Sequence, residues 1–310
     1  MKVAITGGTG FTGPAIVEET LREGHEVVLL EHRKRAPVAN HTRLARVKAD
    51  VDDAASLARA FEGCDAVMHL VAIIREDKKR GATFERVHVE GTRHVVDAAN
   101  AAGVRRFILM SANGVELGVD TPYFRTKLAM EAMVKEAGFE WTIFRPSYIA
   151  ASDAGGAGRT LRGSSAPQQS LGFDAQFADI VDKAPVLPAF GGGRFEIQPV
   201  ARANVAQAFA RALAKPEAIG KTYVLVGPER LTWREYLRRL GALRRRTRPI
   251  VYAPTGAVLL AARALGPLFP ADADQLRMLV AGNVGDATEA VKDLDLRLET
   301  WESAVAGLRR

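Results

Sequence analysis

The chain has 310 residues, of which 47% are hydrophobic and 25% are charged, and these ordinary values exclude a wholly disordered protein. Its single cysteine, Cys64, excludes an internal disulfide framework and a multi-cysteine zinc site. The net charge of +7 is the unusual bulk feature, and it raises the hypothesis of a nucleic-acid or anionic-membrane partner.

Short apolar runs alternate with helical patterns over the first half of the chain. The runs lack polar/apolar alternation, which is typical of strands that helices cover on both faces. They span residues 3–6, 27–30, 46–49, 66–70, 107–110 and 142–145. Helices between them, such as 15–23, make βαβ units with a parallel sheet. We therefore predict an α/β fold, a Rossmann-type doubly wound parallel sheet with a smaller, mostly helical C-terminal lobe.

This regularity ends after Pro146. Residues 153–172 are rich in Gly, Ser and Gln and indicate either a substrate lid or a disordered insertion. A helix over 203–213 and a strand over 221–226 are expected to return to the sheet. We expect the dinucleotide-binding core to span 1–150 and to be rejoined by about 197–228. The substrate or partner lobe would then comprise 151–196 and 229–310.

A glycine-rich turn (TGGTGFTG) lies directly between the first predicted strand and the first predicted helix. It contains G-x-G-x-x-G at Gly8, Gly10 and Gly13, and G-x-x-G-x-x-G starting at Gly7. Glycine lets the backbone turn tightly and approach a pyrophosphate, and the helix N-terminus then offers free N–H groups to the phosphates. In this context the turn predicts a nucleotide cofactor.

Residues at the end of the second predicted strand are expected to determine whether NAD or NADP is preferred. Glu31 stands where an acid accepts hydrogen bonds from the ribose hydroxyls and repels a 2′-phosphate. Arg33 and its basic neighbours follow at once and fit that phosphate. Because Glu31 favours NAD, we predict NAD(P) as the cofactor, with NAD slightly favoured over NADP. Asp50 is placed to meet the adenine amino group, or to cap the next helix.

A tyrosine and a lysine are spaced for proton transfer. Tyr123 and Lys127 stand at i and i+4 and so share one helix face. A nearby ammonium and a nicotinamide cation would lower the phenol pKa into a useful range. The neighbouring loops carry Ser111, Asn113 and Pro146.

Together these motifs resemble the short-chain dehydrogenase/reductase superfamily, in its extended or atypical branch. The matching segments include TGGTGFTG, VEGTRHVVDAA at 89–99, the Tyr123/Lys127 pair and FRP at 144–146. The combination of SANG, TPYFRTK, WTIFRPS and DQLRMLVAGNV is most similar to the NAD(P)H-binding accessory subunit family of respiratory complex I and its bacterial relatives. The resemblance also implies cofactor contacts from Phe11, Thr12, Val51, Leu70, Val71, Ala72, Lys127 and Pro146.

Two positions depart from the family pattern. Asn113 stands where extended members usually carry the serine or threonine that polarises the substrate, and Ser111 lies two residues earlier. Asn113 or Ser111 would then orient the substrate oxygen. His88 replaces the usual asparagine of the V-N-x-x-G-T segment, and we interpret it as a packing or capping substitution.

Three functions follow from these residues. The first is an oxidoreductase or epimerase acting by hydride transfer on a small carbonyl or hydroxyl substrate. The second is a catalytically silent NAD(P)H-binding accessory or assembly protein near a membrane complex, and the third is a redox-sensing regulator. No metal site is expected.

Partners and cellular location are predicted only from the pattern of charged and apolar residues. The arginine-rich segment 230–248 has no interleaved aromatics or nucleic-acid motif, which argues against nucleic acid. Arg244, Arg245, Arg246 and Arg248 are expected to form an exposed cluster. Beside it, the apolar stripe that starts at Val258 favours core packing and leaves peripheral membrane or protein-complex contact as the alternative. We expect a cytoplasmic monomer or homodimer.

Overall fold

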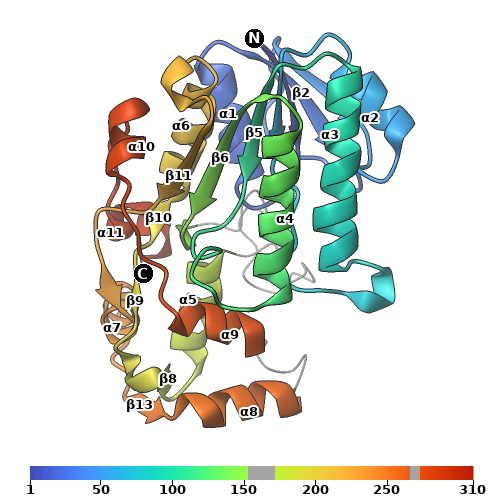
Figure 1. Cartoon of the computed structure of the whole chain (residues 1–310). Coiled ribbons are helices and arrows are strands. Elements are labelled where there is room, and N and C mark those ends of the chain that lie inside the picture. The colour runs from blue at the N-terminus through green and yellow to red at the C-terminus, as the bar shows by residue number, and fades with distance from the viewer. Residues whose placement is uncertain (153–171, 266–272, 310) are drawn as a thin grey trace.

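The computed structural model describes residues 1–152, 172–265 and 273–309. The predicted lid or insertion at 153–172 therefore lies outside the described residues, apart from Gly172. Within them, a seven-stranded sheet has the order β11-β6-β5-β4-β1-β2-β3, and all neighbouring strands are parallel (Figure 1). Its strands are β1 (Lys2–Thr6), β2 (Glu26–Glu31), β3 (Leu44–Lys48), β4 (Ala66–His69), β5 (Arg106–Met110), β6 (Glu140–Pro146) and β11 (Lys221–Leu225). Each predicted strand is found within two residues of its expected limits, and the fold class is confirmed.

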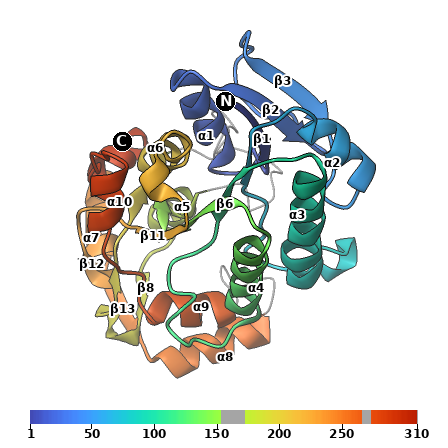
Figure 2. The same ribbon diagram turned by 45° about the horizontal axis from the view of Figure 1, so that its top comes forward.

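Helices cover both faces of this sheet, as the uniformly apolar strands predict (Figure 2). The helices are α1 (Gly13–Arg22), α2 (Ala54–Phe61), α3 (Gly91–Ala101), α4 (Pro122–Glu136) and α6 (Arg202–Ala212). Val3 and Ile5 pack with α1 and α6 in one cluster, whereas Ala4 between them packs with α2, α3 and α4 in the other. Cys64 belongs to this second cluster and is 5% exposed, as a small buried hydrophobe.

The strand order reverses between β1 and β4, which are hydrogen-bonded neighbours in the sheet. In doubly wound sheets, ligands bind beyond the carboxyl ends of the strands on either side of such a reversal. The glycine-rich turn follows β1 at this point, so the topology places it where a dinucleotide would enter.

Many of the remaining described residues form a lobe below the sheet in Figure 1. Its helices are α5 (Phe173–Lys183), α7 (Trp233–Leu243), α8 (Thr255–Leu265), α9 (Ala273–Val280) and α11 (Trp301–Ala304). By contrast, α10 (Thr288–Asp293) lies beside β11, and its Ala290 packs in the same cluster as Val3 and Ile5. Short strands accompany the helices of the lobe: β7 (Ile149–Ala150), β8 (Leu187–Phe190), β9 (Glu196–Ile197), β10 (Val200–Ala201), β12 (Leu231–Thr232) and β13 (Ile250–Ala253). A third cluster of buried side chains, including Trp233, Tyr236 and Trp301, holds the lobe together.

The expected exposed cluster of four arginines is wrong in part. Arg244 is 8% exposed and forms an ion pair with Asp182, and Arg248 donates to backbone carbonyls of α5. Only Arg245 and Arg246 of the four are exposed. The spacing could not distinguish them because the contacts come from α5, some 60 residues earlier. No helix among the described residues is long and apolar enough to cross a membrane, and no cluster there groups three or more metal-binding side chains.

Candidate active site

The turn after β1 is packed so closely that side chains would not fit at two of its glycines. Gly7 has a φ of 74°, and a Cβ on it would lie 2.8 Å from the backbone of Leu70. A Cβ on Gly13 would lie 2.4 Å from the carbonyl carbon of Gly8. The N–H of Gly10 donates to the carbonyl of Gly7 at 3.0 Å. The turn is therefore held against the end of β4 and the start of α1.

The N-terminus of α1 is free to bind an anion. Thr12 precedes the helix but makes no side-chain capping bond, and Pro14 has no N–H, so the N–H groups of Gly13 and Ala15 keep their hydrogen-bonding capacity. Arg202 of α6 lies beside the turn, donating to the carbonyl of Phe11 at 3.4 Å with its guanidinium 5.3 Å from the Phe11 ring centroid. An uncapped helix, a glycine turn and an adjacent cation fit the pyrophosphate of a dinucleotide.

Glu31 ends β2 as expected, but its carboxylate is already bound within the chain. It accepts the N–H of Ala36 at 2.8 Å and forms an ion pair with Arg46. Arg33, two residues further along, is exposed. The acid that favoured NAD is thus neutralised by a cation that the sequence pattern did not single out.

Asp50 follows β3 and lies beside the same end of the sheet. Its Oδ2 is 3.0 Å from Nε2 of His32, and its Oδ1 accepts the N–H of Asp52 at 3.2 Å. The alternative that Asp50 caps the next helix is wrong. Asp53 caps α2 by accepting the N–H of Ser56 at 3.1 Å.

The other expected cofactor contacts gather at the carboxyl ends of neighbouring strands. Val51 lies beyond β3, while Leu70, Val71 and Ala72 follow β4, and Pro146 ends β6. The N–H of Leu70 donates to the carbonyl of Thr6 at 3.1 Å, which continues the β1–β4 pairing into the crevice. The topology therefore brings these residues to one edge of the sheet, where their contacts with a cofactor stay a prediction.

Tyr123 and Lys127 both lie on α4, as their spacing predicts. The Tyr123 ring is surrounded by those of Phe84, His88 and Phe124, with ring centroids 5.7–5.8 Å apart. Burial raises the pKa of the phenol to about 12. Burial is the cause of this shift, so the spacing of Tyr123 and Lys127 does not lower the phenol pKa as the sequence suggests.

Lys127 is 1% exposed and donates from Nζ to the carbonyl of Met110 at 2.9 Å. Burial lowers its pKa to about 7, and the carboxylate of Glu131, one turn further along α4, opposes that shift. At neutral pH the ammonium is accordingly deprotonated in part.

His88 is a packing residue, as interpreted, and it also joins three segments. It lies in a π-helical segment, η2 (Glu85–Glu90), and is fully buried. Its Nε2 accepts the N–H of Ile73 at 3.0 Å, and its Nδ1 lies 2.9 Å from Oγ1 of Thr126 on α4. Burial lowers the pKa of His88 to about 3, so the ring is neutral and the accepting role of Nε2 places the proton on Nδ1. His88 thereby fixes the position of α4 relative to η2, and its ring packs against that of Tyr123.

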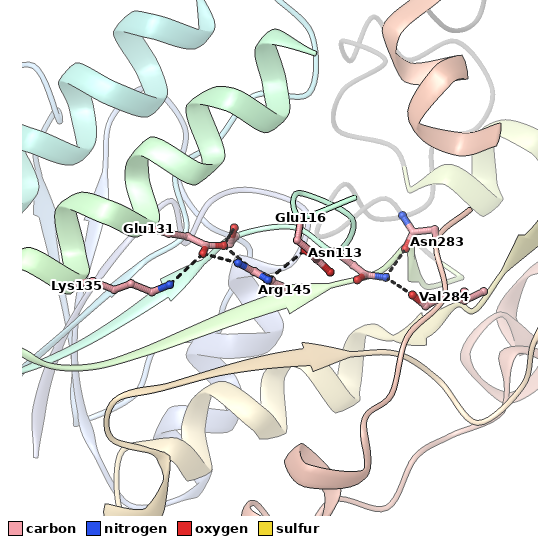
Figure 3. A network of polar contacts seen from close by, with 8 residues as sticks. Asn113, Glu116, Glu131, Lys135, Arg145, Asn283 and Val284 are labelled. Carbon is pink, nitrogen blue, oxygen red and sulfur yellow. Dashed lines mark hydrogen bonds and ion pairs between the residues drawn. The ribbon is translucent and has the colours of Figure 1, made fainter. Parts of the chain in front are cut away.

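Ser111 points into a buried polar network. Its hydroxyl donates to Oε1 of Glu131 at 2.5 Å. Arg145 donates to both carboxylate oxygens of Glu131 at 2.8 Å and to Glu116 at 3.1 Å, and Lys135 lies 3.6 Å from Glu131 (Figure 3). Arginine and serine hold the pKa of Glu131 below its usual value despite burial. This geometry ties α4 to β6 and does not favour Ser111 as the group that orients a substrate.

Asn113 is also bound within the chain. It is 4% exposed, and its Nδ2 donates to Val284 O at 3.0 Å and to Oδ1 of Asn283 at 3.3 Å (Figure 3). Nearby, Thr121 donates to the sulfur of Met278 on α9 at 3.6 Å. The position expected to polarise a substrate instead joins the loop after β5 to a segment 170 residues later.

A buried histidine that no sequence motif indicates links two strands and a helix beside the crevice. His69, at the end of β4, has Nδ1 2.6 Å from Oγ1 of Thr6 and Nε2 3.0 Å from Oγ1 of Thr92 on α3. Burial lowers the pKa of His69 to about 3, so it is a neutral structural link between β1, β4 and α3. Its only signal in the sequence is a histidine within an otherwise apolar strand.

Comparison with known proteins connects this geometry to a family. A family model described as NAD(P)H-binding matches residues 7–180, which is more than half of the chain. The chain belongs to this NAD(P)H-binding family. The expected similarity to the accessory subunit of complex I is confirmed by two mitochondrial relatives. A solved short-chain dehydrogenase/reductase superfamily protein shares the fold at 22% identity.

Two curated relatives of this chain are described as different kinds of protein. A 3-beta-hydroxysteroid dehydrogenase of Mycolicibacterium neoaurum is 37% identical over 125 residues, which cover 38% of this chain and 33% of that protein. The mitochondrial NADH dehydrogenase (ubiquinone) 1 alpha subcomplex subunit 9 of Arabidopsis thaliana is 29% identical over 244 residues, covering 74% of this chain and 55% of that protein. The chain thus spans about a third of the first relative and about half of the second.

Solved structures match the fold along nearly the whole chain. UDP-glucose 4-epimerase of Thermotoga maritima has a TM-score of 0.74 at 18% identity, covering 99% of this chain and 97% of its own. The dTDP-glucose 4,6-dehydratase of Streptomyces venezuelae, solved with NAD, has a TM-score of 0.74 at 20% identity, covering 99% and 96%. At such identities these likenesses show the fold alone.

Proposed function

We propose that the chain is an NAD(P)H-dependent oxidoreductase that reduces a carbonyl group of a small molecule. The observation that carries the proposal is Tyr123, whose hydroxyl has no hydrogen-bond partner within the described part of the chain although rings enclose its sides. The glycine turn and the N-terminus of α1 would hold the cofactor pyrophosphate, and Lys127 would hold the nicotinamide ribose. When bound, the nicotinamide supplies a hydride to the carbonyl carbon.

Tyr123 would supply the proton. Burial raises the phenol pKa to about 12, so the hydroxyl is protonated and only weakly acidic at neutral pH. It would donate its proton as hydride addition makes the substrate oxygen strongly basic. The carbonyl π bond breaks, and the product is an alcohol with its new C–H bond from the hydride and its new O–H bond from Tyr123. The phenolate left on Tyr123 regains a proton from water. His88 and Phe84 would position the ring.

Turnover in the wild-type protein and in Tyr123→Phe tests the proposal. Purified protein would be incubated with NADPH or NADH and a panel of aldehydes and ketones, and cofactor oxidation would be followed by absorbance. Loss of a general acid predicts a rate lower by about 10²–10⁴-fold. Cofactor affinity, measured by nucleotide fluorescence, should be unchanged in the variant. Equal turnover in both proteins refutes the role of Tyr123.

A second function, NAD(P)H binding without turnover, has an observation of its own. The Asn113 amide is bound to Asn283 and Val284, so the substrate-polarising hydroxyl of the family pattern has no counterpart free at that place. The lobe also exposes Tyr252 and Leu260, the latter 68% exposed, as an apolar surface that suits a protein partner. Tight cofactor binding with no oxidation across the panel would support this accessory role instead.

A further inference from the structure

A basic hollow lies at the carboxyl ends of β2 and β3, away from Tyr123 and its surroundings. It has a volume of about 360 Å³. Its lining side chains are Glu31, His32, Arg33, Lys34, Arg35, Arg46 and Lys48. Five of these are cationic and one is a carboxylate, so the hollow has a strong excess of positive charge.

The single carboxylate of the hollow is neutralised. Glu31 forms an ion pair with Arg46 and accepts the N–H of Ala36, which closes the loop after β2 back onto its own start. Arg46 also donates to the carbonyl of Val38 at 2.6 Å, so several contacts fix its position. Both contacts fall on Oε1, so Arg46 balances the charge of Glu31 and one of its two oxygens is no longer offered to a ligand.

The remaining cations of the hollow are not neutralised. No carboxylate in the described ranges forms an ion pair with Arg33, Lys34, Arg35 or Lys48. Arg35 donates to the neutral side-chain amide of Asn40 at 3.1 Å. Four unpaired cations around one hollow repel each other, and a multiply charged anion would relieve that repulsion.

The place of the hollow identifies the anion by chemical class. β2 pairs in parallel with β1, so its carboxyl end lies next to the glycine turn, and Glu31 is in register with Lys48 of β3. A dinucleotide whose pyrophosphate lies on that turn extends its adenosine half over the end of β2. The group that enters the hollow is then the 2′ substituent of the adenine ribose, a hydroxyl in NAD and a phosphate in NADP.

We propose that the hollow binds the 2′-phosphate of NADP(H) and makes NADP(H) the preferred cofactor of this chain. The inference rests on the proposed function only in requiring a bound dinucleotide. It reverses the order that Glu31 suggests from the sequence, because Arg46 balances the charge of Glu31 and occupies one of the two oxygens that would otherwise hold the ribose hydroxyls. Arg33 and Lys34 would contact the phosphate oxygens through charge-assisted hydrogen bonds.

Titration of the wild-type protein with NADPH and with NADH, followed by nucleotide fluorescence, tests the preference. We expect NADPH to bind at least about tenfold more tightly, the change that roughly one charge-assisted contact supplies. Added salt should weaken NADPH binding more than NADH binding, because the extra contacts are between charges. Equal affinities, or tighter NADH, overturn the proposal. Binding of neither nucleotide refutes the proposed function itself, so the two failures are distinguishable.

Two variants and a control test whether the hollow causes the preference for NADPH over NADH. Arg33→Ala removes an exposed side chain and should weaken NADPH about tenfold while leaving NADH within about twofold. Arg46→Met removes a cation and releases Glu31, so NADH should become the tighter ligand. Arg238→Ala removes an exposed arginine of α7 in the lobe and should change neither affinity. If Arg33→Ala weakens both nucleotides equally, the hollow does not recognise the 2′-phosphate.

Competition separates a ribose phosphate site from a general anion site. Adenosine 2′-monophosphate should displace NADPH at concentrations at which adenosine 5′-monophosphate and inorganic phosphate do not. Displacement by inorganic phosphate at the same concentration overturns the proposal, because the hollow would then bind anions without regard to the nucleotide.

Discussion

Replacing Lys127 with methionine should stabilise the cofactor-free protein by an amount that decreases as the pH rises. Burial lowers the pKa of Lys127 to about 7, against 10.5 as its ordinary value. Between these values the unfolded chain binds more protons than the folded chain, so this group makes stability rise with pH. The penalty in the free energy of unfolding is about 4 kcal/mol at pH 7 and about 2 kcal/mol at pH 9.

Urea denaturation of the two proteins at pH 7 and pH 9 measures this penalty. The difference in the free energy of unfolding between Lys127→Met and the wild type should shrink by about 2 kcal/mol from the lower pH to the higher. Loss of the bond to Met110 does not depend on pH and cancels in that comparison. Lys79→Met, at an exposed lysine, should show no such change. A Lys127→Met difference that is the same at both pH values refutes the reasoning.

Three further outcomes follow from the polar contacts around the crevice. Asn113→Ala removes two hydrogen bonds to the segment at 283–284 and should lower the free energy of unfolding by about 1–3 kcal/mol in urea; a change below about 0.3 kcal/mol would contradict the contact. Ser111→Ala leaves the pairing of Glu131 with Arg145 intact and should leave cofactor affinity and turnover within about threefold. A turnover loss of about 100-fold or more would instead assign Ser111 to the reacting centre. Because burial lowers the pKa of His88 to about 3, nitrogen NMR should find its ring neutral with the proton on Nδ1 down to pH 5, and a titration midpoint near 6 would show that the ring is solvated.

The sequence predicts the sheet well because its strands are defined by local composition. Runs such as Val27–Leu30 are apolar without alternation, and burial on both faces of the sheet is the environment that selects such runs. The sequence also predicts the turn after β1, because Gly7 and Gly13 occupy places where a Cβ would overlap backbone atoms. Local patterns of this kind depend on neighbours a few residues away.

The state of the predicted site residues depends on contacts that no local pattern carries. Glu31 reads as a free acid until Arg46, 15 residues later, comes to lie beside it through the pairing of β2 with β3. Asn113 reads as a substrate group until the segment at Asn283 crosses the loop after β5. Likewise, spacing alone indicates a lowered pKa for Tyr123, whereas the surrounding rings remove the water that would stabilise a phenolate.

The distribution of tryptophans gives this chain an internal optical reporter. Trp233 and Trp301 lie in the cluster that holds the lobe, at most 1% exposed, whereas Trp141 is on β6 and packs at the edge of the sheet cluster. Intrinsic emission should therefore report mostly on the lobe, while far-ultraviolet circular dichroism reports on the whole backbone. If the lobe opens before the sheet unfolds, the two signals will have different denaturation midpoints. If the contacts of Asn113 bind the two parts into one cooperative unit, the midpoints will coincide.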